Sequence, residues 1–553
     1  MASGKVAAKG ILLAALGLWS AGSVGNGIVR ERMEAIDLDF PVSALGVILS
    51  ADTAVSSFYR ERDYTLAWSR DVDREGLLSA IKTSARHGLS PADYHDSRLS
   101  RYDTSDLDQL DSDTRASLDL LMTESALKLA SHLLDGKVNP ETLKTGDFAN
   151  RHQRRTDDIL TRILADGEVA EELDRLAPSQ PGYRQLMDAR SRINRLFGTL
   201  WEPIPAGTTI RPDNTDPRLP SIRQRLITLG DLTNPENAEQ QGLEAYYDGE
   251  LVTAVKRFQA RHGLDNDGLI GQDTMAMLNL PPTERLSRID ATLERWRWLP
   301  DDLGDTYIVV NIAGFELRLV KDNADVLTTR VIVGRPSRQT PVIRDRIRHL
   351  VFNPNWTVPR TIMIEDQLPV IRQNPDYLNA MDISVYRGWG PDREPVDPDT
   401  VDWSTLHENY FPFQLVQEPG PRNALGQVKF MFPNQFDVYL HDTPARGLFS
   451  RSQRSLSSGC IRVEDAFGLA TALLANANGW TRERIREIVE SRSLTTVHLD
   501  KPVPIHLEYW TAWVDGSGTL QMRNDLYNHN PQLTLALETP LESGLMIRQA
   551  SAD

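Results

Sequence analysis

The spacing of hydrophobic residues divides the chain into a helical first part and a β-rich second part. Between residues 37 and 200, apolar side chains recur at three- and four-residue spacings, as in Leu118, Leu121 and Leu129. That spacing lines one face of a helix. Breakers such as Asn139-Pro140 separate the runs. We therefore predict a helical scaffold domain over residues 37–200.

A second, shorter helical unit is predicted over residues 217–282. Leu251, Val255 and Phe258 recur at helical spacing, and the turn Gly268 to Gly271 comes before a last apolar run. A linker rich in Pro and Thr precedes this unit. The pattern indicates a compact group of three helices.

From Tyr307 onward the sequence is rich in β-forming residues, and Phe315, Leu317 and Leu319 alternate with Glu316, Arg318 and Val320, which is the period of a strand. We expect a mostly antiparallel sheet in a domain over residues 305–500. A mixed, Pro-containing stretch at about 357–420 interrupts it, and an insertion of that size often caps a site. Residues 501–553 return to β-rich sequence and predict a β extension. The fold class expected is therefore multidomain α+β.

The N-terminal residues resemble an export signal. Lys5 and Lys9 precede the apolar run Ile11 to Trp19, and small residues follow. We expect residues 1–29 to be a cleaved signal peptide or a membrane anchor, so anchoring in an inner membrane stays open. The protein would then lie in the periplasm, secreted or held by its N-terminus.

Charge and cysteine content narrow the function. The 553 residues carry a formal net charge of -16, which argues against a nucleic-acid partner because such binding needs Lys and Arg to neutralise phosphates. The single cysteine, Cys460, cannot form an internal disulfide and is either a small buried side chain or a nucleophile. Motifs for zinc, redox or nucleotide cofactors are missing from the sequence, so we expect no cofactor. The patterns do not address the oligomeric state.

The strongest chemical signal joins His441 to Cys460. A cysteine attacks well only as a thiolate, so it needs a base nearby. His441 ends an apolar run, and Cys460 ends a turn of small residues that we expect to lead into a helix. Gly459 allows a close approach to a substrate, and amides from Ser458 to Cys460 are candidate donors to an oxyanion. If the imidazole draws the thiol proton, alkylation of Cys460 should occur at a pH where an isolated thiol reacts slowly.

The segment resembles the signature of the L,D-transpeptidase catalytic domain. In that signature a His-x-Thr-Pro run precedes a Ser-x-Gly-Cys-x-Arg turn, and residues 441–444 and 457–462 match it. Residues 217–282 resemble a three-helix peptidoglycan-binding module. Ser458 stands where most members have His, which we interpret as a feature of the large multidomain branch.

The resemblance implies the roles of several residues. Cys460 would be the nucleophile and His441 the base, oriented by a main-chain carbonyl rather than by the Asp442 side chain. Arg462 and Trp356 would bind the anionic peptide stem, although Arg462 is equally a candidate for a structural ion pair. The implied substrate is peptidoglycan, and the implied product is a 3-3 crosslink.

Two other functions remain open from the sequence. An L,D-carboxypeptidase or endopeptidase would use the same residues with water as the acceptor. A catalytically inactive wall-binding scaffold would explain the binding module and Ser458, but the presence of both His441 and the single cysteine argues against it.

Overall fold

A computed structural model describes residues 21–49, 53–102, 107–143, 155–233, 245–374, 376–390, 392–475 and 480–540. The chain forms two compact units, one of residues 1–137, 153–177 and 538–553 and the other of residues 138–152 and 178–537. Most of the expected export segment, residues 1–20, lies outside the described part. No described helix has both the length and the apolar run that a membrane crossing needs.

Helices build the first unit, as the apolar spacing predicts. The longest, α5, is buried on most of its surface, including Leu118, Leu121 and Leu129. Its N-terminus is capped by Asp111, whose carboxylate accepts from the amides of Asp113 and Thr114. The main helices of this unit are α1 (Ala21–Asp37), α2 (Thr53–Glu61), α3 (Asp71–Thr83), α5 (Ser112–Asp135), α6 (Thr156–Asp166) and α7 (Val169–Arg175).

A buried carboxylate ties three parts of this unit together. Asp119 of α5 accepts hydrogen bonds from the Tyr59 hydroxyl at 2.5 Å and from the amides of Ala67 and Trp68 at 2.9 Å. Burial is the main reason why the pKa of Asp119 is raised.

The second unit begins with helical segments. The helices α9 (Leu219–Leu229), α10 (Gly249–Arg261) and α11 (Gln272–Asn279) form the predicted three-helix group. Asp248 caps α10, and the Tyr247 hydroxyl donates to the carbonyl of Gly268 at 2.7 Å. Two further helices, α8 (Pro181–Asn194) and α12 (Pro282–Arg297), are joined by a two-point ion pair between Arg190 and Asp290.

A nine-stranded sheet forms the core of the β-rich domain. Its order is β13-β5-β14-β12-β11-β6-β15-β3-β4, and β5 also pairs with β4, so the sheet closes on itself. Most neighbours are antiparallel, which confirms the expectation, while β12–β14, β13–β5 and β15–β3 are parallel. Helices α16 (Ala466–Leu474) and α17 (Arg482–Glu490) contribute to the same core. The strands are β3 (Thr306–Asn311), β4 (Glu316–Lys321), β5 (Ala324–Gly334), β6 (Ile343–Phe352), β11 (Val428–Met431), β12 (Leu440–His441), β13 (Ser455–Ser457), β14 (Ile461–Val463) and β15 (Thr495–Glu508).

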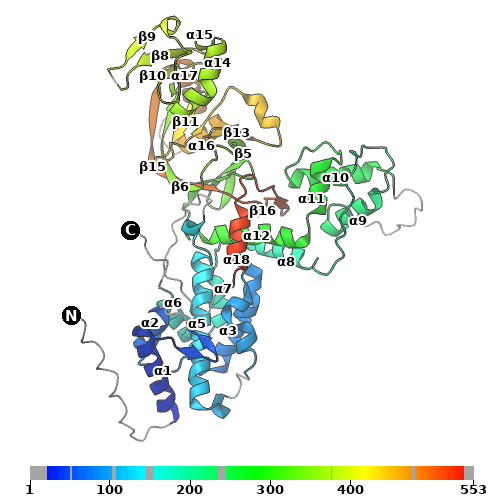
Figure 1. Ribbon diagram of the computed structural model, residues 1–553, viewed down its shortest axis with the longest axis vertical. Coiled ribbons are helices and arrows are strands. Elements are labelled where there is room, and N and C mark those ends of the chain that lie inside the picture. Colours follow the sequence, from blue (N-terminus) through cyan, green and yellow to red (C-terminus); the bar gives the residue numbers. More distant parts are fainter. Residues whose placement is uncertain are drawn as a thin grey trace, which may run out of the picture. The chain divides into compact units, whose positions relative to one another are not determined.

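The insertion has a hydrophobic core of its own, centred on residues such as Met363, Leu378 and Leu415. Its antiparallel sheet has the order β7-β10-β8-β9, and Figure 1 shows β8, β9 and β10 grouped with helices α14 and α15. A π-helical turn, η5, joins α13 to α14. The elements are β7 (Trp356–Thr357), α13 (Arg360–Ile362), η5 (Met363–Gln367), α14 (Leu368–Gln373), α15 (Tyr377–Ala380), β8 (Ile383–Arg387), β9 (Glu394–Val396) and β10 (Phe413–Gln417).

The C-terminal residues differ from the expected β extension in two ways. Strand β15 starts at Thr495 and crosses the predicted boundary at residue 501, because its second half pairs with both β3 and β6. A short hairpin, β16 (Ala512–Val514) with β17 (Leu520–Met522), is followed by helix α18 (Asn530–Glu538). The α18 sequence alternates like a strand, but Leu533 and Leu537 lie four residues apart and pack together in one apolar cluster.

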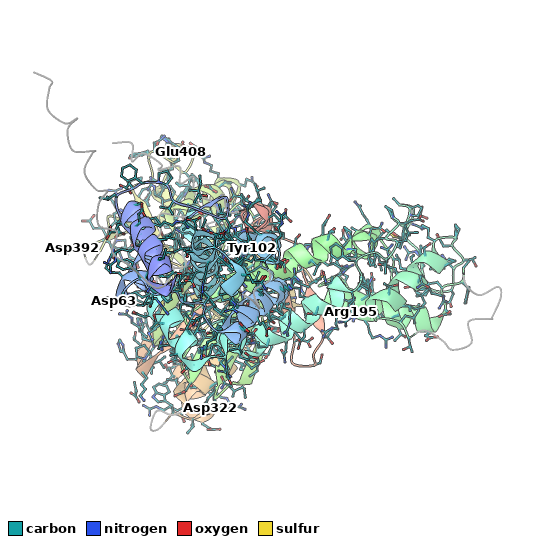
Figure 2. The ribbon with its side chains drawn as sticks, turned by 90° about the horizontal axis from the view of Figure 1, so that it is seen from below. Asp63, Tyr102, Arg195, Asp322, Asp392 and Glu408 are labelled. Atoms are coloured by element: carbon teal, nitrogen blue, oxygen red, sulfur yellow. The ribbon has the colours of Figure 1, made fainter. Side chains whose placement is uncertain are left out.

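These observations confirm the α+β multidomain fold class. Acidic side chains at the surface account for part of the negative charge: Asp63, Asp322 and Asp392 are exposed (Figure 2).

Candidate active site

Strand pairing brings the region of His441 next to that of Cys460, nineteen residues later. Strands β12 and β14 are parallel, with Leu440 opposite Ile461 and His441 opposite Arg462. Leu440 and Ile461 are fully buried in the core. Because side chains alternate along a strand, His441 and Arg462 point to the other face of the sheet.

Cys460 lies just before β14. Because side chains two residues apart along a strand point to the same face, Cys460 lies on the face of Arg462. The Ile461 amide donates to the carbonyl of Tyr439, so Cys460 lies beside Tyr439. We expected the turn of Cys460 to lead into a helix. Strand β14 comes first instead, and this strand sets the register with His441.

The thiol of Cys460 is partly buried and is the only cysteine side chain in the protein. Its Sγ atom lies 3.8 Å from the carbonyl oxygen of Asp437, and Tyr439 interacts with the thiol electrostatically. Burial raises the pKa of Cys460, while the hydrogen bonds from Tyr439 and the charge of Arg462 act in the opposite direction.

His441 is buried, and its Nδ1 lies 2.6 Å from the carbonyl oxygen of Asp442. A carbonyl can only accept, so Nδ1 carries the proton and Nε2 of the neutral ring is left as the basic nitrogen. Burial first, and then the charges of Arg462 and Lys429, lower the pKa of His441 to about 3. The imidazole is therefore neutral near pH 7.

The Asp442 side chain has other partners. It accepts from the amide of Gln427 at 2.9 Å and from Arg446 at 2.5 Å. The group that orients His441 is thus the main-chain carbonyl, in agreement with the expectation from the sequence.

Burial works against the expected easy alkylation of Cys460, which stays a prediction. That prediction assumed that the imidazole draws the thiol proton in the resting protein. Burial penalises both charged forms, so it raises the pKa of Cys460 and lowers that of His441. Burial therefore favours the neutral form of each of the two side chains.

The turn before Cys460 is held by its own hydrogen bonds. Ser457 Oγ donates to the carbonyl of Cys460 at 2.5 Å and accepts from the Gly459 amide at 3.2 Å. The φ angle of Gly459 is 116°, a conformation that only glycine adopts readily. Because the Gly459 amide is directed at Ser457, it is a weaker oxyanion candidate in this state than the sequence suggested.

The two remaining predicted site residues, Arg462 and Trp356, have different surroundings. Arg462 acts on both His441 and Cys460 through its charge, and its buried Nε has no hydrogen-bond partner among the described residues. Trp356 lies in β7 opposite Gln417 and packs against the core of the insertion.

Sequence reasoning missed two side chains beside the pair. The Tyr439 ring lies edge-on to His441 with centroids 5.8 Å apart, and the alternation along β12 could have identified it. Lys429 of β11 lies opposite His441, with its Nζ 5.4 Å from the centre of the Tyr439 ring. No local signal predicts that register.

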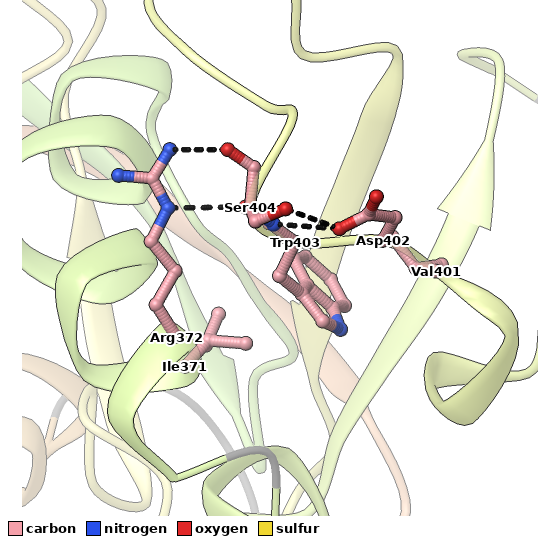
Figure 3. Close-up of a pocket in the computed structure, with 6 residues that line it drawn as sticks. All are labelled: Ile371, Arg372, Val401, Asp402, Trp403 and Ser404. Carbon is pink, nitrogen blue, oxygen red and sulfur yellow. Dashed lines mark hydrogen bonds between the residues drawn. The ribbon is translucent and has the colours of Figure 1, made fainter.

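A shallow cavity of about 440 Å³ lies elsewhere, on the insertion (Figure 3). Its polar groups already have partners, since Arg372 donates to the carbonyls of Trp403, Ser404 and Leu406. We assign no chemistry to this cavity.

One group of acidic side chains in the described part has the spacing of a metal site: Glu61, Asp157 and Asp158 of the first unit. The guanidinium of Arg155 forms ion pairs with all three, at 3.1, 2.8 and 3.4 Å. Arg155 thus already supplies the positive charge that these carboxylates need.

Three known protein families match the chain. A scaffold domain matches residues 53–189, a putative peptidoglycan-binding domain matches residues 215–278, and an L,D-transpeptidase catalytic domain matches residues 305–490. The last range contains both His441 and Cys460.

Among known proteins, a putative L,D-transpeptidase of Haemophilus influenzae is 35% identical over 307 residues, which is 55% of this chain and 60% of that protein. The N-acetylmuramoyl-L-alanine amidase CwlL of Bacillus licheniformis is 46% identical over 43 residues, which is 8% of this chain and 12% of the amidase. The matches therefore span less than two thirds of either relative.

Solved structures of L,D-transpeptidases also align, at 14% identity. The protein from Mycobacterium smegmatis has a TM-score of 0.19, with 37% of this chain and 58% of that chain covered. The protein from Xylanimonas cellulosilytica has a TM-score of 0.16, with 55% and 99% covered. These scores are too low to carry an argument. The family matches and the H. influenzae relative confirm the resemblance first noted in the sequence: the chain is a multidomain protein that combines a scaffold domain, a peptidoglycan-binding domain and an L,D-transpeptidase catalytic domain.

Proposed function

We propose that the protein forms 3-3 crosslinks between peptide stems of peptidoglycan, with Cys460 as the nucleophile and His441 as the general base. The observation that supports this most is the parallel pairing of β12 with β14, which directs His441 and Arg462 to the face on which Cys460 lies. The carbonyl at Nδ1 fixes the tautomer in which Nε2 of His441 is the basic nitrogen.

In the first half-reaction, Nε2 takes the Sγ proton as Sγ attacks the carbonyl carbon of the third stem residue, which is joined to the nitrogen of D-Ala. The C–N bond then breaks, and the imidazolium returns the proton to the departing amine of D-Ala. A thioester on Cys460 remains. Because burial favours the neutral form of both side chains, the proton moves during the attack, and the charge of Arg462 favours the thiolate that develops.

In the second half-reaction, the side-chain amine of an acceptor stem attacks the thioester. Nε2 of His441 takes the proton of that amine, and the C–S bond breaks to release the thiolate, which is then reprotonated. The product is a new amide between two stems. Water in place of the amine would give a trimmed monomer, as in the carboxypeptidase alternative.

Mass spectrometry of tetrapeptide stems incubated with the purified protein tests this proposal. A crosslinked dimer together with a thioester-sized adduct on Cys460 is the expected result. Trimmed monomers alone would replace the proposal with the hydrolase, and unchanged stems with no adduct would favour the inactive scaffold. Cys460→Ser should give neither adduct nor product.

The location and partners follow from the substrate. Peptidoglycan lies outside the cytoplasm, so we place the protein there, with the export segment over residues 1–29 as its route. The helices α9, α10 and α11 would hold the enzyme on the wall, consistent with the peptidoglycan-binding family match over residues 215–278.

A further inference from the structure

The loop of residues 335–342, between β5 and β6, holds the turn before Cys460 at three successive positions. The amide of Arg335 donates to the Ser457 carbonyl at 3.0 Å. Arg338 donates to the Ser458 hydroxyl at 2.9 Å, and the Thr340 hydroxyl donates to the Gly459 carbonyl at 2.7 Å. Of these three contacts, only that of Arg338 is made by a long charged side chain.

The same guanidinium is held by the insertion. Arg338 forms an ion pair with Asp366 at 2.5 Å and another with Glu365, and both acids belong to the π-helical turn η5. Arg335 adds a contact with Asp366 at 3.2 Å. The Arg338 side chain is only 12% exposed, whereas Asp366 is 33% and Glu365 58% exposed. The partly buried arginine therefore links two surface acids to the turn of the nucleophile.

We propose that Arg338 is a positioning residue, which transmits the placement of the insertion to Ser458 and so to Cys460. A guanidinium offers five donors in one plane, so it can serve a hydroxyl and two carboxylates together. Ser458 is followed by Gly459, where the backbone has more freedom than at any other residue type. An external hydrogen bond at Ser458 then restricts the orientation of the Cys460 amide and thiol. This inference rests on the proposed function of Cys460.

A merely structural ion pair makes a different prediction. It would lower stability when broken and leave the rate constant of the folded protein unchanged. A positioning role instead lowers the rate of acylation at saturating stem, because misplacement of a reacting group by about 1 Å can slow the step by about a hundredfold. The positioning role therefore predicts a lower kcat and the structural role an unchanged kcat, and KM does not distinguish them.

The experiment measures single-turnover formation of the Cys460 thioester with a soluble tetrapeptide stem, followed by mass spectrometry. Arg338→Gln, Ser458→Ala and the double variant form one cycle, and Arg338→Lys tests whether the charge alone suffices. The double variant E365Q/D366N changes only two acids at the surface. It should therefore keep the fold even if the variants of Arg338 and Ser458 lose it. Arg422→Gln is the control, since it breaks a two-point ion pair of an exposed arginine, with Asp382, at the flank of the insertion.

We expect acylation to fall about tenfold or more in Arg338→Gln, with a smaller loss in E365Q/D366N and partial recovery in Arg338→Lys. Adding Ser458→Ala to Arg338→Gln should cost little more, because both remove the same contact. The Arg422→Gln control should acylate like the wild type. If E365Q/D366N and Arg338→Gln both acylate like the wild type, or if the two effects in the cycle simply add, the positioning role is wrong. Failure of the wild type itself to form a thioester would instead overturn the proposed function.

Discussion

The Tyr439 hydroxyl offers the most direct test of how the thiol is tuned. A hydrogen bond from this hydroxyl to the Cys460 thiolate would lower the thiol pKa against the effect of burial. Tyr439→Phe removes only this oxygen. The ring keeps its edge contact with His441 and its position under Lys429. We therefore expect the pKa of Cys460 to rise further, with little repacking.

The expected shift in the pKa of Cys460 follows from the free energy that such a hydrogen bond contributes. A hydrogen bond to a charged group contributes about 1.5–3 kcal/mol, which corresponds to roughly one to two pKa units. The thiolate fraction below the pKa then falls by about ten- to hundredfold. A more basic thiolate is also more nucleophilic, with a Brønsted coefficient of about 0.4–0.5, which restores a factor of about three to ten. The net slowing of alkylation is about three- to tenfold.

Iodoacetamide alkylation of Cys460, followed by mass spectrometry across pH, measures this shift. The midpoint should move to higher pH in Tyr439→Phe, and the rate at neutral pH should fall. Tyr410→Phe is a matched control, because Tyr410 is 56% exposed and lies on the insertion. If Tyr439→Phe had an unchanged profile, or one shifted to lower pH, the hydroxyl would not stabilise the thiolate and our account of the site would fail.

Three further predictions concern the base, a buried histidine and the binding module. His441→Ala should slow acylation by about 10²–10⁴-fold yet leave the pH profile of Cys460 alkylation in place, because the neutral imidazole carries no charge; a shift of the profile by a full unit would indicate an ion pair. His506 is buried with its pKa lowered to about 3, so only the unfolded chain gains a proton as pH falls from about 6.5 toward 3, and stability should fall by up to about 1.4 kcal/mol per pH unit. Urea unfolding at several pH values should show a smaller slope for His506→Gln, and equal slopes would contradict this. Deleting residues 217–282 should weaken pelleting with insoluble sacculi while soluble stems are still turned over, and undiminished pelleting would remove the wall-binding role.

Local patterns predicted much of the catalytic domain. The β-rich pattern from Tyr307 onward identified β3 and β4: in β4 the apolar Leu317 and Leu319 lie in the core between half-buried Glu316 and Arg318, and β3 is buried on both faces. The motif predicted a site at His441 and Cys460, and the burial of their apolar neighbours Leu440 and Ile461 places both residues at the same level of the sheet. In these segments, local sequence and tertiary structure favour the same conformation.

Contacts between distant segments could not be predicted in this way. Lys429 lies opposite His441 only because β11 pairs with β12 in one register, and nothing near Lys429 specifies that register. The effect of burial on the two pKa values could not be predicted for a similar reason. A sequence shows that an imidazole and a thiol can meet, but the extent of burial, which raises the pKa of one and lowers that of the other, depends on the whole domain.

Ser458 shows how one departure from the family pattern fits this site. The residue at this position accepts a hydrogen bond from Arg338, and a hydroxyl does so at any accessible pH. A protonated imidazole has no lone pair for the guanidinium and would place a second positive charge beside it. With serine here, the only imidazole in this catalytic segment is that of His441, whose pKa is already lowered by the charges of Arg462 and Lys429. Serine at position 458 therefore keeps the hydrogen bond between Arg338 and the turn independent of pH. Under the proposed mechanism, His441 then remains the single base for proton transfer.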